Sequence, residues 1–361
     1  MYPDQAVRKV LIYRTGSLGD TVVALPCFHQ IARAFPSAER VLLTDIPVRQ
    51  KAPTAMAVLS GTGLVHRDMR YPGATRKVGE ILSTLREIRR YRPNVLVHLM
   101  PRGSLKEMRR DQIFFRLAGV RRIVGLGTEV PVHRCDPATG MYEAQASLLA
   151  RSIAELGDAD VENPENWSLH LSPDEQEKAR RALAPLAGRP LMVCGPGTKR
   201  QANDWGQENW RALLGRLSER YPSYALATLG AKEETEYCEY AAQEWAGPKL
   251  NLAGRLNPRE SAAVIGHAVA FLGHDSGPMH LAASVGVPSV VVFSARNKPG
   301  VWFPFGRKNQ VIYHRTDCMT CGLETCVEMG KKCILSVTVG EMERAVDAVL
   351  RPIASPATVA L

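Results

Sequence analysis

Residues 271–288 read FLGHDSGPMHLAASVGVP, and the pattern in and around them decides the fold. A strand is predicted at 269–272, where a short apolar run is followed by a polar turn. A helix is predicted at 277–285, because an Ala-rich stretch there is closed by a glycine and a proline. A further strand is predicted at 289–293. Strand, helix and strand in this order are typical of a parallel sheet that is covered by helices.

The same alternation extends through the chain in two blocks. The acidic segment 157–173 contains two prolines and is interpreted as the linker between them. We therefore predict two Rossmann-like α/β domains, residues 1–168 and 169–361, which face a central cleft at the carboxyl ends of their strands. The other predicted strands lie at 9–13, 40–44, 95–99, 122–125, 191–194 and 225–229, and the other predicted helices at 21–35, 76–91, 106–117, 142–156, 210–221, 258–267, from 233, and near the C-terminus.

Composition excludes several classes of protein. Of the 361 residues, 45% are apolar and 23% charged, as in an ordinary globular protein. There is no run of about 20 apolar residues to span a membrane, and the first residues lack the features of a secretory signal, so a cytoplasmic location is expected.

The positive charge is concentrated in the first half of the chain. Residues 1–151 carry 24 Lys and Arg against 12 Asp and Glu. This basic half would attract an anionic partner, although a solvated basic surface is the simpler interpretation.

The polar turn at 274–280 has the chemistry of a phosphate site. Backbone N–H groups and the positive end of the following helix can hold a diphosphate around Ser276 and Gly277. His280 lies one turn further in and can donate to the same oxygens. Asp275 and Ser276 can also be ordinary helix caps, and His280 a packed core residue. The density of polar groups favours the functional interpretation.

A second candidate loop follows the first predicted strand. Gly16 and Gly19 allow the backbone to turn sharply and come close to a ligand, Ser17 lies between them in this candidate acceptor loop, and Asp20 stands at the start of the next helix. A helix cap is the alternative role of Asp20. The glycines do not form the G-x-G-x-x-G fingerprint, so hydride transfer with a dinucleotide is not indicated.

Two loops of the second block carry further candidates. Thr198 and Lys199, with Arg200, follow the strand at 191–194 and could neutralise a diphosphate leaving group. Glu234 follows the strand at 225–229 and could accept hydrogen bonds from ribose hydroxyls. A solvated basic loop and acids in the first turn of a helix are the alternatives.

Four cysteines lie close together near the C-terminus. Their number and closeness would suit a tetrahedral structural zinc ion, although the spacing is not that of a zinc ribbon, and packing or redox pairing are alternatives. The candidate zinc ligands are Cys318, Cys321, Cys326 and Cys333.

Together these motifs resemble glycosyltransferase family 9, the ADP-heptose:lipopolysaccharide heptosyltransferases. Residues 275–283 look like the family's D-[ST]-G-x-x-H-x-A donor signature, and residues 16–20 look like its G/S-x-x-G-D loop. Trp205 and Trp210 match a W-x4-W pattern. The resemblance implies a GT-B fold, an inverting glycosyltransferase that needs no cofactor or catalytic metal, a nucleotide-sugar donor such as ADP-heptose, and a lipopolysaccharide core or related anionic glycan as acceptor.

The resemblance also implies roles for single residues. Asp20 would be the general base, Glu234 would contact the donor ribose, and Asp275 would orient its loop or contact the sugar. The family usually has Lys where this chain has Asn203, so Lys199 or Arg200 would supply the charge instead. The donor diphosphate would be held by Ser276, Gly277 and His280.

Two other functions remain open on the sequence alone. A nucleotide-sugar epimerase would use the same two-domain fold. A non-catalytic protein would use the basic half to bind an anionic surface, and peripheral contact with the inner face of the cytoplasmic membrane fits either an enzyme or such a protein. Nucleic acid is not expected as a partner, because zinc-finger, aromatic RNA-binding and basic recognition-helix patterns are missing from the sequence.

Overall fold

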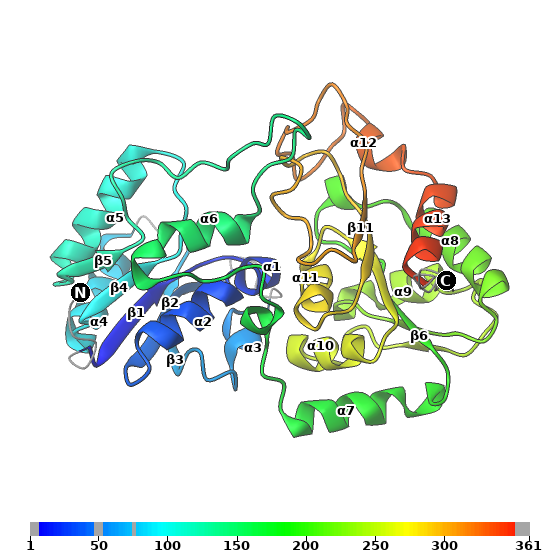
Figure 1. The fold of residues 1–361 in the computed structure, drawn as a ribbon, viewed down its shortest axis with the longest axis horizontal. Coiled ribbons are helices and arrows are strands. Elements are labelled where there is room, and N and C mark those ends of the chain that lie inside the picture. Colours follow the sequence, from blue (N-terminus) through cyan, green and yellow to red (C-terminus); the bar gives the residue numbers. More distant parts are fainter. Residues whose placement is uncertain (1–6, 47–52, 74–76, 351–361) are drawn as a thin grey trace, which may run out of the picture. The chain divides into compact units, whose positions relative to one another are not determined.

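The computed structural model describes residues 7–46, 53–73 and 77–350 and divides the chain into two compact units (Figure 1). The first unit runs to Gln176 and includes residues 299–302, and the second unit contains the rest. The division falls after residue 176 rather than after residue 168. Among the described residues, no helix is long and apolar enough to cross a membrane.

The first unit is built on a parallel sheet with the strand order β3-β2-β1-β4-β5. The chain builds outwards from β1 to β3 and then crosses to β4 on the other side of β1. Ligands of open α/β sheets bind at such a switch point, beyond the carboxyl ends of the two central strands. The strands are β1 (Lys9–Tyr13), β2 (Glu39–Ile46), β3 (Arg67–Pro72), β4 (Val95–His98) and β5 (Arg122–Val124).

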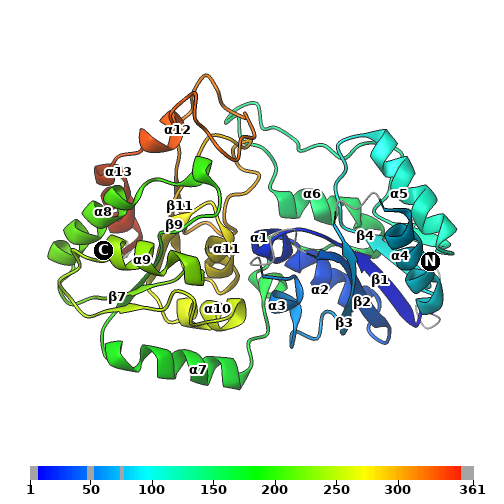
Figure 2. The same cartoon turned by 180° about the vertical axis from the view of Figure 1, so that it is seen from behind.

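Helices cover both faces of this sheet. Leu11 and Leu96 of the strands pack against Ile88 of α4 and Phe115 of α5 in one apolar core. Helices α2 and α6 contact each other on the other face (Figures 1 and 2). The helices are α1 (Leu18–Val22), α2 (Leu25–Ala34), α3 (Met56–Leu59), α4 (Val78–Tyr91), α5 (Leu105–Leu117) and α6 (Gln145–Ser152).

Two segments of the first unit differ from the prediction. The single helix expected at 21–35 is two helices, because Pro26 lacks the N–H that a continuous helix would need and instead opens α2. The segment 157–173 is not a free linker. It packs on α2, where Arg33 donates to the side chain of Asn166 at 2.6 Å and His29 bonds to the carbonyl of Ser168 at 2.9 Å. Helix α7 (Pro173–Leu183) then leads into the second unit.

The second unit repeats this architecture on a parallel sheet with the strand order β8-β7-β6-β9-β10-β11. Its switch point lies between β6 and β9. Helices α8, α9 and α13 pack on one face, and α10 and α11 pack together in the same unit (Figure 2). The strands are β6 (Leu191–Gly195), β7 (Ala225–Thr228), β8 (Lys249–Asn251), β9 (Ala270–His274), β10 (Ser289–Val292) and β11 (Gln310–Ile312), and the helices α8 (Gln207–Arg220), α9 (Thr235–Ala241), α10 (Pro258–Gly266), α11 (Gly277–Ser284), α12 (Lys332–Leu335) and α13 (Val339–Leu350).

Candidate active site

The loop after β1 holds a carboxylate directly over a glycine. Oδ2 of Asp20 accepts hydrogen bonds from the backbone N–H and the hydroxyl of Ser17, both at 2.8 Å. Gly16 has a φ of +125°, and a Cβ there would lie 2.6 Å from Cβ and Cγ of Asp20. Only glycine leaves room for the carboxylate over this turn. Asp20 therefore does cap α1, at its third residue, while Oδ1 lies 3.6 Å from Nη2 of Arg14.

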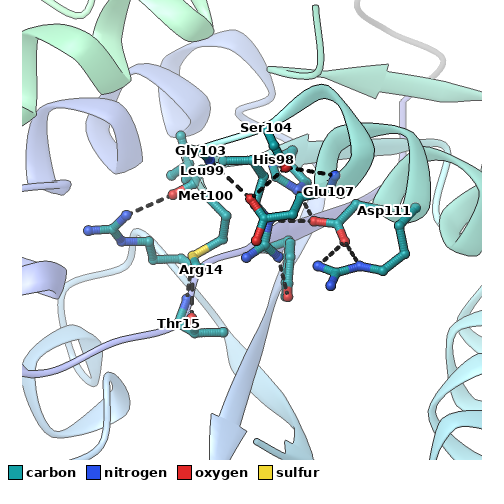
Figure 3. A network of polar contacts seen from close by, with 12 residues as sticks. Arg14, Thr15, His98, Leu99, Met100, Gly103, Ser104, Glu107 and Asp111 are labelled. Carbon is teal, nitrogen blue, oxygen red and sulfur yellow. Dashed lines mark hydrogen bonds and ion pairs between the residues drawn. The ribbon is translucent and has the colours of Figure 1, made fainter. Parts of the chain in front are cut away.

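A second loop, between β4 and α5, is fastened to the first (Figure 3). The side chain of the buried Arg14 donates to two backbone carbonyls, that of Leu99 at 2.8 Å through Nη1 and that of Asp20 at 2.7 Å through Nη2. The N–H of Thr15 contacts the sulfur of Met100 at 3.2 Å. Since these loops follow β1 and β4, the predicted residues Gly16, Ser17, Gly19 and Asp20 all lie at the switch point of the first sheet.

In the second unit, helix α11 begins without a side-chain cap. Ser276 occupies the cap position, but its Oγ is buried and has no hydrogen-bond partner among the described residues. The neighbouring α10 is capped by Asn257, whose Oδ1 accepts from two backbone N–H groups at 2.9 Å. His280 is buried one turn further into α11, behind Gly277. A hydroxyl without a partner at an open helix start is the arrangement that an oxyanion would complete.

Asp275 lies among amides and guanidiniums at the end of β9. Its Oδ2 is 3.5 Å from Nδ2 of Asn203 and 3.4 Å from Nδ2 of Asn297. Burial raises the pKa of the Asp275 carboxyl to about 6, and the Arg200 and Arg296 guanidiniums partly oppose this. Burial, and then the proximity of Arg200, lower the pKa of Arg296. Two guanidiniums thus lie near Asp275, and Nε of Arg200 is also 3.5 Å from Oε1 of the exposed Glu324, so two cations and two carboxylates meet at this place.

Asn203, which stands where the family resemblance predicts a Lys, has an internal role. Asn203 is fully buried, donates to the carbonyl of Asp275 at 3.1 Å and accepts from the hydroxyl of Ser294 at 2.7 Å. Its amide joins the turns after β9 and β10. Arg296, which was not predicted from the sequence, instead brings positive charge to this place. The available signal was a basic residue in the loop that follows the buried strand β10.

The raised pKa of Asp275 predicts a pH-dependent stability. Because the carboxyl titrates near 6 in the folded protein and near 3.8 otherwise, its protonated form favours folding below about pH 4, and this contribution is lost as the pH rises through 6. Relative to the Asp275→Asn variant, the wild type should therefore lose up to about 3 kcal/mol of unfolding free energy between pH 4 and 7. Urea denaturation at several pH values measures this difference, and a constant difference would contradict the burial of the charge.

Glu234 is held by two glycine-containing loops. A Cβ on Gly197 would lie 2.5 Å from Cδ of Glu234, and one on Gly230 would lie 2.8 Å from its Oε2. The same oxygen accepts a hydrogen bond from the N–H of Ala231 at 2.7 Å. Glu234 therefore also caps the helical turn in which it lies, which is the alternative role considered for it above. The predicted Thr198 and Lys199 follow in the loop after β6. Lys199 is exposed and Thr198 half-buried.

The two tryptophans of the W-x4-W pattern belong to the core. Trp205 and Trp210 are fully buried, with ring planes at 83°. The backbone N–H of Trp205 and the indole N–H of Trp210 both donate to Nε2 of His274, at 3.0 and 3.2 Å. Burial lowers the pKa of His274 to about 4, so the ring is neutral and can accept. These residues fix β9 and the turn that follows it.

The late cysteines do not form the predicted zinc site. All are free thiols, and no group of three or more His, Cys, Asp or Glu within the described ranges could hold a metal ion. Backbone contacts order their loop instead. Gly322 and Leu323 accept from the Arg296 guanidinium, and the N–H of Cys326 donates to Gln201 at 2.8 Å. Through these contacts the loop braces the segments that carry Asn203 and Arg296.

The model of glycosyltransferase family 9 (heptosyltransferase) matches residues 127–332, more than half of the chain. The chain belongs to glycosyltransferase family 9. It is 27% identical to lipopolysaccharide heptosyltransferase 1 of Pseudomonas aeruginosa over 88% of this chain and 87% of the relative.

Solved structures of the family share its fold. A family 9 glycosyltransferase of Veillonella parvula superposes with a TM-score of 0.70 at 14% identity and covers 95% of this chain and 97% of that one. The ADP-heptose lipopolysaccharide heptosyltransferase II of E. coli gives 0.65 at 18% identity, over 94% and 98%. The predicted GT-B fold class and the predicted family are therefore confirmed, and the reaction class is glycosyl transfer rather than epimerisation or anion binding alone.

Proposed function

We propose that this family 9 enzyme transfers heptose from ADP-heptose to a lipopolysaccharide core or a related anionic glycan, with inversion and without a catalytic metal or cofactor. The similarity to a lipopolysaccharide heptosyltransferase and to an ADP-heptose heptosyltransferase supports the donor and the acceptor. The proposal depends mainly on the start of α11, which has no side-chain cap and where the buried Ser276 hydroxyl has no hydrogen-bond partner among the described residues. A donor diphosphate would supply the missing acceptor atoms for both.

The donor would be held by groups around this helix start. Ser276, Gly277 and His280 would bind the diphosphate, and Arg200 and Arg296 would provide the charge that the family's Lys provides elsewhere. Glu234 would accept from the ribose hydroxyls, with Thr198 and Lys199 beside the diphosphate. Preorganised cations and helix N–H groups stabilise the charge that develops on the departing diphosphate, a contribution of several kcal/mol in other enzymes. They would do so without a metal ion.

Asp20 is proposed as the general base. Its Oδ2 is engaged by Ser17, so Oδ1 would take the proton from the acceptor hydroxyl. The acceptor oxygen would then form a bond to the anomeric carbon while the bond from that carbon to the diphosphate oxygen breaks, and ADP would leave with the electron pair. One displacement from the opposite face inverts the anomeric configuration. The net positive half, residues 1–151, would bring the enzyme to the acidic glycolipid at the cytoplasmic face of the inner membrane.

The reaction can be tested directly. The enzyme is incubated with ADP-heptose and core glycolipid, with and without EDTA, and the product is analysed by mass spectrometry and by NMR of the anomeric proton. We expect addition of one heptosyl group, inverted configuration and equal rates with EDTA. Isomerisation of the nucleotide sugar without acceptor would instead indicate an epimerase, and loss of activity with EDTA would contradict the metal-free mechanism.

The Ser276 hydroxyl gives a prediction in which stability and binding change in opposite directions. A buried hydroxyl without a partner costs about 1–3 kcal/mol, so Ser276→Ala should stabilise the ligand-free enzyme by about 1 kcal/mol. It should also weaken ADP binding by about tenfold to a hundredfold, because a hydrogen bond to a charged phosphate is lost. Thermal unfolding and calorimetric titration with ADP measure both effects.

Ser284 provides the matched control in the same helix. Its hydroxyl is satisfied by the carbonyl of Leu281 at 2.7 Å. Ser284→Ala should therefore leave ADP binding unchanged. Equal ADP affinity of the wild type and Ser276→Ala would remove Ser276 from the donor site.

A further inference from the structure

A buried polar network lies at the switch point of the first sheet, apart from the predicted site residues (Figure 3). At its centre is Asp111 of α5, which is buried. Its Oδ2 accepts from Nε of Arg102 at 2.6 Å and from Nε2 of His98 at 3.2 Å, and its Oδ1 accepts from Nη2 of Arg110 at 2.9 Å. These contacts lower the pKa of Asp111 to about 2, although burial acts to raise it. The carboxylate is therefore charged at any physiological pH.

This network fixes the guanidinium of Arg102 but does not use all of its hydrogen-bond donors. Besides Asp111, its guanidinium contacts Tyr13, whose hydroxyl accepts from Nη2 at 3.1 Å and whose ring centroid is 5.7 Å away. The Tyr13 hydroxyl is in turn 2.9 Å from that of Tyr71. In the described part of the chain, Nη1 of Arg102 meets no hydrogen-bond acceptor. The side chain is 16% exposed, so a rigid guanidinium offers one free edge.

Arg102 is the cationic group of this loop whose edge an anion would meet. Burial lowers the pKa of His98, so that ring is neutral, and the Asp111 carboxylate lies between the guanidiniums of Arg102 and Arg110. Backbone N–H groups at the nearby start of α5 already have hydrogen-bond partners. The N–H of Gly103 donates to the Glu107 carboxylate at 3.1 Å, and the N–H of Glu107 donates to the Ser104 hydroxyl at 3.3 Å. An anion in this loop would therefore meet Arg102 rather than the helix end.

The network is also joined to the loop of the proposed base. Arg102 lies on the loop between β4 and α5, and the same loop is tied to Arg14 and Thr15 through Leu99 and Met100. A group bound by Arg102 would thus lie on the loop next to that of Asp20, within one rigid sheet edge. A guanidinium fixed in this way binds phosphate or carboxylate through paired hydrogen bonds.

We propose that Arg102 binds an oxyanion of the acceptor, a phosphate or a carboxylate, and that Asp111 and Tyr13 position its guanidinium for that contact. This inference rests on the proposed function, because it assigns the acceptor to the first unit. Arg102 is then a specificity residue for anionic acceptors, and Asp111 is a positioning residue that acts through it.

Initial rates on three acceptors test the inference: intact core glycolipid, phosphatase-treated glycolipid and carboxyl-reduced glycolipid. We expect Arg102→Ala to raise the KM for the intact acceptor about tenfold to a hundredfold, with the KM for ADP-heptose unchanged. One of the stripped acceptors should be used equally poorly by the wild type and the variant. That acceptor identifies the group, phosphate or carboxylate, that Arg102 binds.

Three further variants separate recognition from folding. Arg110→Ala removes a guanidinium from the same carboxylate, but this side chain is 62% exposed, and the acceptor KM should not change. Asp111→Asn should raise the acceptor KM and leave kcat largely unchanged. Arg102→Gln can still donate to Asp111, so it keeps the measurement possible if Arg102→Ala unfolds. If the Arg102 variants discriminate between the acceptors as the wild type does, the inference is wrong, whereas absence of transfer by the wild type would overturn the proposed function itself.

Discussion

Replacing Asp20 by Asn is expected to lower kcat by about 10²–10⁴-fold, the usual contribution of a general base. The amide oxygen of Asn can still accept from the N–H of Ser17, so the cap of α1 and the fold should persist. What the variant loses is an atom that can take a proton from the acceptor. The KM for ADP-heptose should stay close to the wild-type value. Steady-state kinetics measure kcat and KM, and thermal unfolding measures whether the fold is kept.

Ser17→Ala is the matched control for Asp20→Asn. It removes the hydroxyl that lies 2.8 Å from Oδ2 but keeps the carboxylate and the backbone contact. The loss of one cap interaction costs about 1 kcal/mol of stability, and kcat should change by only a few fold. Turnover by Asp20→Asn at the wild-type rate, with unchanged substrate binding, would exclude the general-base role.

Replacing Gly197 by Ala is expected to weaken donor binding by about tenfold to a hundredfold, the value of a charged hydrogen bond. The added Cβ would lie 2.5 Å from Cδ and 2.6 Å from Oε1 of Glu234, so the carboxylate must move. It cannot simply shift towards Gly230, which is also in close contact with it. Because the displaced atoms end a flexible side chain, stability should change little. Titration with ADP and the KM for ADP-heptose measure the effect.

Gly266→Ala is the control for the second unit, because a Cβ at Gly266 would meet nothing within 4 Å. Its donor affinity should equal that of the wild type. Glu234→Gln should reproduce part of the loss seen in Gly197→Ala, since it removes the charge without adding bulk. If Gly197→Ala binds ADP as tightly as the wild type, Glu234 does not contact the donor.

Most elements were predictable because their signals are local. The buried central strands such as Val95–His98 are apolar runs, and helices such as α10 carry their own cap and proline signals. The edge strands β3, β8 and β11 were not predicted. In β3 only Met69 is buried, so the apolar pattern that reveals a strand is missing there, and pairing with β2 creates the strand.

The sequence by itself determined the family, the two α/β units and the loops that carry Asp20, Glu234 and the 274–280 turn. These features depend on residues that are neighbours in the chain, such as glycines beside a carboxylate or polar residues between a strand and a helix. In the 274–280 turn the sequence pointed to a phosphate seat. The tertiary structure added that Ser276 Oγ has no partner among the described residues.

Only the tertiary structure decided which distant residues complete each site. The sheet register brings Asn203, Asp275 and Arg296 together, and it places Arg102 and Asp111 beside Tyr13. The structure also shows that the cysteine loop contacts the Arg296 guanidinium, and that within the described ranges no three His, Cys, Asp or Glu side chains are gathered for a metal ion. The physical reason is that parallel strands bring loops from separate parts of the chain to one edge of the sheet. Burial at that edge then shifts the pKa values of the side chains and determines which of their polar atoms have partners, and neither can be read from the sequence of one loop.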